Sequence, residues 1–329
     1  MKNLLSIATS LLIAQLTFGQ VNSIDPTEIF PIERSHSYVG FQIKYMGYAM
    51  VRGRFEDFSG TVRYNPGDIE KTSVTMSVDV GSIDTDGEWR DKDLKSDNWF
   101  DAEKYPKMYF ESTSVEKTNE GFNITGDLTI KETTKQVVIN MNPPSGIMKD
   151  VRGDSQVIFT GSLTIDRTDY GVKGERWSVV KEGITGVDDM VNIELSILCK
   201  RINEDNFRRW VSNVDRPQGK LYSIIQDKGL KAGLKAFDEM LADTASNVNV
   251  NALNLAAYML LKEGKVEEAS KAFKRNLEAF PDDANSYDSY AESLLYMGNY
   301  EMALKNYQKA YALDPDNMNA KAIIRVLEK

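Results

Sequence analysis

Apolar residues occupy every second position in many runs between about residues 30 and 200 of this chain. In residues 121–130, for example, Phe122, Ile124, Leu128 and Ile130 share one phase and polar residues take the other. This pattern is typical of half-buried antiparallel strands, and we expect about eight of them. The clearest other runs lie at 39–45, 74–80, 157–165 and 191–199, and weaker ones lie near 51–64, 106–115 and 136–142.

The polar phase of these runs holds Thr, Ser, Asp, Lys and Asn, so the outer face of the sheet meets water. In an outer-membrane barrel the apolar residues instead face outward to the lipid. About eight strands with an apolar interior favour a soluble closed barrel that can hold one small ligand, and a two-sheet sandwich is the alternative. Gly126 and Gly161 fall in the apolar phase, where they either leave room for a ligand or bend the strands.

Composition excludes several kinds of chemistry. A net charge of −9 argues against a nucleic-acid binder. The single cysteine, Cys199, excludes an internal disulfide, and the single histidine, His36, excludes a multi-histidine metal centre. Ser37 follows His36, but neighbours in a strand point to opposite faces. We therefore expect a hydrogen-bonded structural histidine, no catalytic residue, no metal and no cofactor.

The first 19 residues predict a secretory signal peptide. Lys2 precedes a mostly apolar stretch from Leu4 to Phe18, and Gly19 is a small residue suited to cleavage after it. The alternative hypothesis is a membrane anchor, but the apolar stretch is short for crossing a bilayer, and polar residues interrupt it. We expect cleavage near Gly19, a periplasmic or secreted protein, and no transmembrane segment in the mature chain.

Several short blocks, in this order along the chain, resemble the YceI-like family. They are SHSYVGF at 35–41, GRF at 53–55, FSG at 58–60, WRDKDLKS at 89–96, WFD at 99–101, KYP at 104–106, FES at 110–112, GDLTI at 126–130 and DRTDYG at 166–171. The resemblance implies an exported, lipocalin-like antiparallel barrel over residues 30–200 that encloses a polyisoprenoid or another long-chain lipid. Tyr45 and Asp93 stand near positions where the family often has histidine.

Such binding requires an elongated apolar tunnel and no catalytic group. The candidate ligand-binding residues share the interior phase of the strands or lie between strands: Phe41, Ile43, Met76, Val78, Phe110, Phe122, Ile124, Phe159, Leu163 and Trp177. Plain core packing is the alternative role for each of them. Trp99 and Phe100 are candidates to cap the barrel. Arg90 lies in a run of mixed charge, which is either a solvated helix or loop or a headgroup contact.

Residues 218–329 have a helical period and repeat every 34 residues. The clear repeats are 250–283 and 284–317, in which equivalent positions are Ala257 and Ala291, Gly264 and Gly298, Ala269 and Ala303, Phe273 and Tyr307, and Pro281 and Pro315. This period and these residue types resemble tetratricopeptide repeats. Residues 218–242 fit a partial first repeat and 317–328 a capping helix, while 201–217 form a linker or a first helix.

In tetratricopeptide relatives, the first helix of each repeat lines a concave face that binds protein partners. The residues expected on that face here are Asn251, Asn254, Tyr258, Asp288, Glu292 and Tyr296. Asn and acidic residues do not suit the basic clamp that such repeats use for carboxylate termini, so a basic or extended peptide fits better. The alternative is that the repeats only dock on the barrel or dimerise.

The sequence therefore predicts an exported, non-catalytic binding protein, whose barrel carries an apolar ligand and whose repeats recruit a protein. The runner-up is an interaction or scaffold protein with a filled barrel core. A lipid-modifying enzyme comes third, because His36 lacks a well-placed nucleophile.

Overall fold

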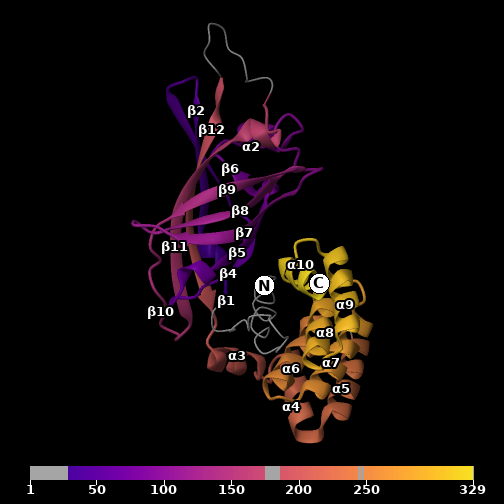
Figure 1. Ribbon diagram of the computed structural model, residues 1–329. Helices are drawn as coiled ribbons and strands as arrows, with labels where there is room; N and C mark the ends of the chain where they lie inside the picture. Colours follow the sequence, from indigo (N-terminus) through magenta and orange to yellow (C-terminus); the bar gives the residue numbers. More distant parts are fainter. Residues whose placement is uncertain (1–28, 175–185, 244–245, 247, 329) are drawn as a thin grey trace. The chain divides into compact units, whose positions relative to one another are not determined.

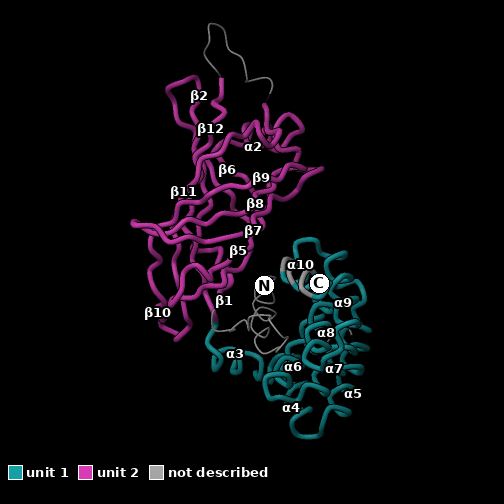
Figure 2. The backbone as a smooth tube through the Cα atoms, viewed as in Figure 1, with its two compact units in different colours: residues 1–27, 202–329 teal, residues 28–201 magenta. Residues whose placement is uncertain are grey.

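The computed structural model describes residues 29–174, 186–243, 246 and 248–328. The chain divides into two compact units, one of strands over residues 28–201 and one of helices that begins at Ile202 (Figure 2). The change of sequence period near residue 200 coincides with this boundary. The predictions for residues 1–19 and for Trp177 lie outside the described residues.

One antiparallel sheet of twelve strands forms the described part of the first unit. All of its strands except three short ones are six residues or longer. The strands are β1 (Ile29–Pro31), β2 (Tyr38–Tyr45), β3 (Ala49–Phe55), β4 (Phe58–Arg63), β5 (Ser73–Asp79), β6 (Ile83–Asp84), β7 (Lys107–Lys117), β8 (Phe122–Ile130), β9 (Thr133–Met141), β10 (Met148–Lys149), β11 (Ser155–Asp166) and β12 (Val187–Arg201).

The sheet curls so that the segment after its edge strand β1 returns to β12, which gives the barrel shape in Figure 1. The strand order is β1-β4-β5-β7-β8-β9-β11-β12-β2-β3-β6, and β10 pairs with β11 beside this path. Ile32, just after β1, pairs with Cys199 in β12, and the Glu33 amide donates to the Leu198 carbonyl at 2.7 Å. The predicted antiparallel barrel is thus confirmed, because β12 pairs with β11 on one side and with β2 on the other, and Ile32, just after β1, also reaches β12.

Residues 51–64, which the pattern suggests are one weak strand, belong to β3 and β4. Phe55 ends β3, Phe58 begins β4, and both rings are buried. Glu56 and Asp57 form the corner between them, where the Glu56 amide donates to Ser82 and Asp79 donates to the Asp57 carbonyl. No Gly, Pro or Asn marks this corner, so turn composition does not separate the two strands.

Gly126 and Gly161 leave no room for a ligand, because neighbouring side chains already fill the space beside them. A methyl group built on Gly126 would lie 2.5 Å from the ring of Phe110. One built on Gly161 would lie 2.4 Å from the sulfur of Met141. Because glycine has no side chain, a large side chain from the adjacent strand can lie over the strand that contains the glycine.

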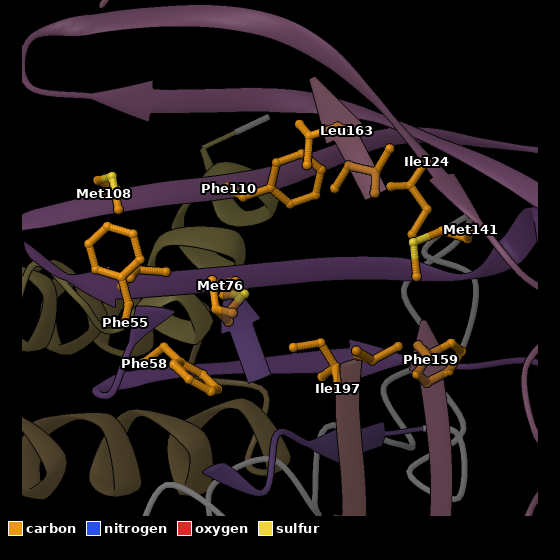
Figure 3. Close-up of a cluster of buried hydrophobic side chains, with 14 of the residues drawn as sticks. Phe55, Phe58, Met76, Met108, Phe110, Ile124, Met141, Phe159, Leu163 and Ile197 are labelled. Carbon is orange, nitrogen blue, oxygen red and sulfur yellow. The ribbon is translucent and has the colours of Figure 1, made fainter. Parts of the chain in front are cut away.

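Side chains from both sides of the curled sheet meet in one apolar core. In Figure 3, Phe110 of β7 lies in the upper part of the view, and Ile197 of β12 and Phe159 of β11 lie in the lower part. The ring of Tyr64 packs edge-on against Phe159, with 5.2 Å between the ring centroids. This edge-to-face geometry is a favourable arrangement for aromatic pairs.

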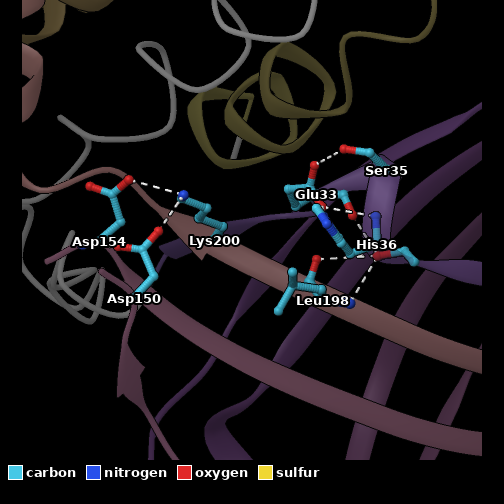
Figure 4. A network of polar contacts seen from close by, with 8 residues as sticks. Glu33, Ser35, His36, Asp150, Asp154, Leu198 and Lys200 are labelled. Atoms are coloured by element: carbon cyan, nitrogen blue, oxygen red, sulfur yellow. Dashed lines mark hydrogen bonds and ion pairs between the residues drawn. The ribbon is translucent and has the colours of Figure 1, made fainter. Parts of the chain in front are cut away.

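Lys200 at the end of β12 forms ion pairs with the loop between β10 and β11. Its ammonium group lies 2.7 Å from Asp150 and 3.0 Å from Asp154 (Figure 4). The hydrogen bond from Lys200, helped by the amides of Asp154 and Arg152, lowers the pKa of Asp150 below its ordinary value of 3.8. Lowering the folded-state pKa of an acid stabilises the fold above the unfolded-state value.

We expect Lys200→Met to melt at a lower temperature than the wild type at neutral pH. The gap should narrow as the pH falls below 3.8, since the stabilisation from Asp150 is lost as the carboxyl becomes protonated in the folded state. Thermal melts followed by circular dichroism at a series of pH values measure this gap. A gap that stays constant down to the acid limit of folding would contradict the assignment.

The second unit consists of helices that pack in antiparallel pairs. They are α3 (Glu204–Val211), α4 (Pro217–Lys228), α5 (Leu230–Ala242), α6 (Asn251–Lys262), α7 (Val266–Ala279), α8 (Ala284–Tyr296), α9 (Tyr300–Leu313) and α10 (Met318–Leu327). Residues 201–217, predicted as a linker or a first helix, contain α3, whose Phe207 and Val211 are buried in the helical core. In Figure 1, α4, α6 and α8 stand on one side of this unit and α5, α7 and α9 on the other.

The 34-residue repeat has a direct structural counterpart. Ala269 and Ala303, one repeat apart, are fully buried in α7 and α9, and so are Phe273 and Tyr307. Gly264 and Gly298 both adopt positive φ, +76° and +72°, in the turns before those helices. This left-handed backbone explains the repeated glycine, since other residues adopt it at a cost. The predicted helical repeats are thus confirmed.

Candidate functional site: an apolar cavity in the barrel

The first unit encloses a cavity of about 350 Å³. Its wall is almost entirely aliphatic and aromatic, with contributions from strands all round the barrel. Residues from β2, β5, β7, β8, β11 and β12 reach it because their apolar phase points inward. The barrel interior is therefore not a completely filled core.

The structure places eight of the ten predicted ligand-binding residues on the cavity wall: Phe41, Ile43, Met76, Val78, Phe110, Ile124, Phe159 and Leu163. Phe122 differs from the prediction, because it is buried in the same core but does not line the cavity. It is the first residue of β8, where it pairs with Lys117 on one side and Met141 on the other. Trp177 lies outside the described residues.

Helix α2 (Glu88–Lys95) supplies part of the cavity wall that the strand pattern does not predict. Arg90, Asp93 and Leu94 line the cavity, although the sequence around them is strongly charged. The Arg90 guanidinium donates to the side chain and the carbonyl of Thr85, both at 2.7 Å. Trp89 also lines the cavity while its side chain is largely exposed, so α2 lies where the cavity approaches the surface.

Trp99 and Phe100, the predicted barrel caps, both line the cavity. The Trp99 indole donates to the Asp93 carboxylate at 2.9 Å. The same ring lies under the guanidinium of Arg167, with 5.2 Å between the group and the ring centroid. Asp93, Trp99 and Arg167 therefore contact one another in sequence and form a cap over the apolar wall of the cavity.

Arg167 is the buried cation of this cap, with 4% of its surface exposed. Its five N–H groups donate to the carbonyls of Val172, Lys173, Val187 and Asp188 and to the carboxylate of Asp189. Burial lowers the pKa of Arg167, while the neighbouring Asp189 opposes that shift. Since every donor is used, Arg167 holds two chain segments together and has no hydrogen left for a ligand.

Thr72 is one of the few polar residues on the cavity wall. Its hydroxyl oxygen is buried and has no hydrogen-bond partner among the described residues. Such an atom can donate to a ligand hydroxyl or carbonyl. The sequence gives no sign of this role, because Thr72 precedes β5 and belongs to no alternating run.

His36 does not lie beside a nucleophile. It belongs to a 3₁₀ turn, Arg34–His36, rather than to a strand, and its ring bonds to the Glu33 carboxylate at 2.8 Å (Figure 4). The Ser37 hydroxyl instead donates to the Glu33 carbonyl and accepts from the Leu198 amide at 2.9 Å. The side chain of His36 is 76% exposed to solvent, so it does not share the apolar environment of the cavity.

Cys199 is a buried thiol in β12, with none of its surface exposed. Burial raises the pKa of its thiol well above the ordinary value, and the thiolate is the reactive form. We expect a thiol reagent to label the folded protein about 1,000-fold or more slowly than the unfolded protein, since a core residue reacts only through opening. Mass spectrometry with and without denaturant measures this ratio. Fast labelling of folded protein would show that β12 opens locally.

The residues predicted for a partner-binding face lie on α6 and α8. Asn251 and Tyr296 are half-buried, whereas Asn254, Tyr258, Asp288 and Glu292 are buried. In α6, every position from Ala252 to Leu261 is buried, and partner binding by these residues stays a prediction. The structure does bring the two sets of residues together, because the Tyr258 hydroxyl donates to Glu292 at 2.8 Å.

The comparisons with known proteins agree with this division. A model described as the YceI-like domain matches residues 30–198, just over half of the 329-residue chain. The chain belongs to the YceI-like family. A tetratricopeptide repeat model matches residues 249–316, after the YceI-like domain. The combination supports a role in binding and interaction, and domains of these two kinds are typically non-catalytic.

Similar proteins cover the YceI-like part of the chain. A UPF0312 protein of Photorhabdus laumondii is 35% identical over 144 residues, which are 44% of this chain and 74% of the relative. BcnA of Burkholderia cenocepacia is 25% identical with a TM-score of 0.45, covering 51% of this chain and 98% of BcnA. A polyisoprenoid binding domain from Saccharophagus degradans is 12% identical with a TM-score of 0.40, covering 53% and 98%.

Within the described ranges, no group of three or more His, Cys, Asp or Glu side chains is arranged to hold a metal ion. No helix in the same ranges has the length and apolar character needed to cross a bilayer.

Proposed function

We propose that the YceI-like domain holds a long apolar molecule, a polyisoprenoid or a related lipid, and that the helical repeats recruit a protein partner. The cavity of about 350 Å³ carries the first part of this proposal. Small-molecule sites measure roughly 300–1,000 Å³ and are lined mainly by apolar side chains with a few polar groups. The cavity has that size and that lining.

The hydrophobic effect alone supplies the affinity that such a ligand needs. Burying apolar surface stabilises a complex by about 25 cal/mol per Å² removed from water, so a long hydrocarbon gains with every carbon that enters. A flexible chain suits a tunnel between strands better than a rigid ring system does. Thr72 and Arg90 are polar residues on the wall that can give a modest selection of the headgroup.

Export and the absence of catalysis belong to the same proposal. The pattern of residues 1–19 supports cleavage near Gly19 and delivery to the periplasm or the exterior. An apolar carrier is useful there, because a lipid that leaves a membrane meets water. The exposed position of His36 and its bond to Glu33 support binding without chemistry.

The test is native mass spectrometry of the protein purified from its own host without detergent, followed by organic extraction and lipid identification. We expect a stoichiometric long-chain lipid. Protein that arrives empty is then titrated with a long-chain polyprenol and, for comparison, with oleic acid. Failure to bind either lipid would overturn the carrier function and leave a scaffold with an unused cavity.

A further inference from the structure

The hairpin that joins β2 to β3 has an apolar tip. From Tyr45 to Met50 the sequence reads YMGYAM, without a charged residue, Asn or Ser. Hairpin turns are normally rich in Gly, Asn, Asp and Ser, and here only Gly47, with a φ of +79°, follows that preference. The Tyr48 amide donates to the Tyr45 carbonyl at 3.3 Å, and this turn leaves Tyr48 85% exposed. Packing inside the barrel therefore does not explain an aromatic residue at this position.

Three more large apolar side chains are exposed on neighbouring elements. Met50 lies in β3, opposite Lys44 of β2. Met190 lies in β12, the strand on the other side of β2, and Trp89 lies in α2. The exposed fractions of these three residues range from 43% to 66%. We call Tyr48, Met50, Trp89 and Met190 the apolar rim.

The apolar rim is continuous with the wall of the cavity. Val51 and Val191 each follow a methionine of the rim, and both line the cavity. Trp89 lines the cavity itself, and so does Tyr45, at the base of the turn that holds Tyr48. In Figure 1, the ends of β2 and β12 lie at the top of the barrel, with α2 beside them and β10 at the opposite end. Apolar surface thus extends from the inside of the cavity to the outside of the barrel at one end.

The tip between β10 and β11 provides a comparison within the same unit. Val151 is fully exposed there and Met148 is 48% exposed, yet neither of them lines the cavity. Exposed apolar side chains are therefore not peculiar to the rim. What distinguishes the rim is that it borders the space proposed to hold a lipid.

We propose that the apolar rim inserts into the surface of a lipid bilayer, so that the cavity exchanges its ligand directly with the membrane. This inference rests on the proposed carrier function and adds the surface at which the carrier loads or unloads. A long hydrocarbon that crosses water between a bilayer and the cavity exposes its whole apolar surface on the way. Contact between the rim and the bilayer removes that step.

The side chains of the rim suit a bilayer better than a protein partner. Tyr48 and Trp89 each combine an apolar ring with a polar tip, the character that places tyrosine and tryptophan at membrane–water interfaces. Met50 and Met190 are flexible and adapt to irregular surroundings. The four side chains project from separate elements, and a fluid bilayer accepts them singly, whereas a protein partner needs a packed pocket for each anchor.

Charge does not drive this contact. The exposed ionisable side chains near the rim are of both signs: Lys44 and Arg52 on the hairpin, Glu88 and Lys92 on α2, and Asp189 on β12. Attraction to anionic headgroups and repulsion from them therefore largely offset each other. Insertion of apolar side chains does not depend on ionic strength, unlike contacts between exposed charges. Neutral and anionic vesicles should consequently bind the protein alike.

The test is flotation of the whole chain, purified from its host, with vesicles of phosphatidylcholine, alone or with added phosphatidylglycerol. The rim variant is Tyr48→Ser with Met50→Ser, since neither residue lines the cavity. The matched control is Met148→Ser with Val151→Ser, which removes exposed apolar side chains at the opposite tip. Trp89→Ser is a second, independent change to the rim. Circular dichroism melts establish that all variants fold.

We expect the wild type and the control to float with both kinds of vesicle, equally at about 0.1 M and about 1 M NaCl. The rim variant and Trp89→Ser should partition about tenfold or more weakly, because less apolar surface leaves water. Transfer of a long-chain polyprenol from vesicles to the rim variant should slow by a similar factor. The rim variant should still take up polyprenol added without vesicles as the wild type does.

The failures of this inference and of the carrier function are distinguishable. Wild-type protein that takes up polyprenol and does not float, or rim variants that float as well as the wild type, would reject the rim and leave the carrier function standing. Flotation that requires phosphatidylglycerol and disappears at high salt would show electrostatic attachment in place of insertion. Wild-type protein that takes up no polyprenol by either route would reject the carrier function, and the inference with it.

Discussion

Replacing Val191 with tryptophan should deprive the barrel of its apolar ligand. Val191 lies in β12, lines the cavity and is only partly buried by other side chains. The indole would occupy a substantial part of a space of about 350 Å³. Overpacking a filled site costs about 1–3 kcal/mol, and each 1.4 kcal/mol corresponds to about tenfold in affinity. We therefore expect the lipid bound per protein, measured by extraction and mass spectrometry, to fall about tenfold or more.

The neighbouring residue provides a matched control. Asn192 follows Val191 on the same strand, points to the outer face and is exposed. Asn192→Trp adds an indole one position away without entering the cavity, so it should retain its lipid. Equal lipid content in both variants and the wild type would show that the ligand does not occupy the space beside Val191. Loss from both would indicate damage to β12 and not filling of the cavity.

The barrel was predictable where one face of each strand is buried. In β8 and β11, inward residues such as Ile124 and Phe159 are buried while most of their neighbours are not, and the alternation reports this directly. The corner at Glu56 and Asp57 was not predictable, because its hydrogen bonds come from Asp79 and Ser82 on other segments. Local composition carries no record of such distant partners.

The cavity wall was predictable only in its strand portion. Phe110 and Leu163 reach the cavity through the alternation, but Phe122 shares the same phase and does not. Whether an inward residue meets a hollow or a packed region depends on how far along the barrel it lies. The role of Gly126 depends on the ring of Phe110 from the adjacent strand, which the pattern of one strand does not contain.

In the helical unit, too, the sequence pattern predicted which residues are equivalent but not their burial. The 34-residue spacing predicted the equivalence of Asn254 and Asp288, and of Tyr258 and Glu292, on successive first helices. Burial of these side chains is a property of the whole array, since α6 has no exposed face between Ala252 and Leu261. A period identifies which residues are equivalent, and it does not show how deeply they lie.

The structural role of Arg167 was also not predictable from the sequence, and replacing this residue should have the largest effect on stability. Four of its five hydrogen bonds end on backbone carbonyls, at Val172, Lys173, Val187 and Asp188, which any residue type supplies. Arg167→Met keeps the apolar stem and leaves these carbonyls and the Asp189 carboxylate without the guanidinium. The Asp189 side chain is half exposed, so the ion pair itself contributes little. A buried carbonyl left without its donor costs about 1–3 kcal/mol, and we expect a loss of about 3 kcal/mol in the free energy of unfolding.

Denaturant unfolding of the whole chain, followed by tryptophan fluorescence, measures this loss, because Trp99 packs against the guanidinium. Arg167→Lys should recover little, since an ammonium has three donors and lacks the planar fork that reaches two segments at once. Arg52→Met on the exposed side of β3 is the control and should change stability by less than about 0.5 kcal/mol. Full stability of Arg167→Lys would mean that charge alone, and not the five-fold hydrogen bonding, holds the cap over the cavity.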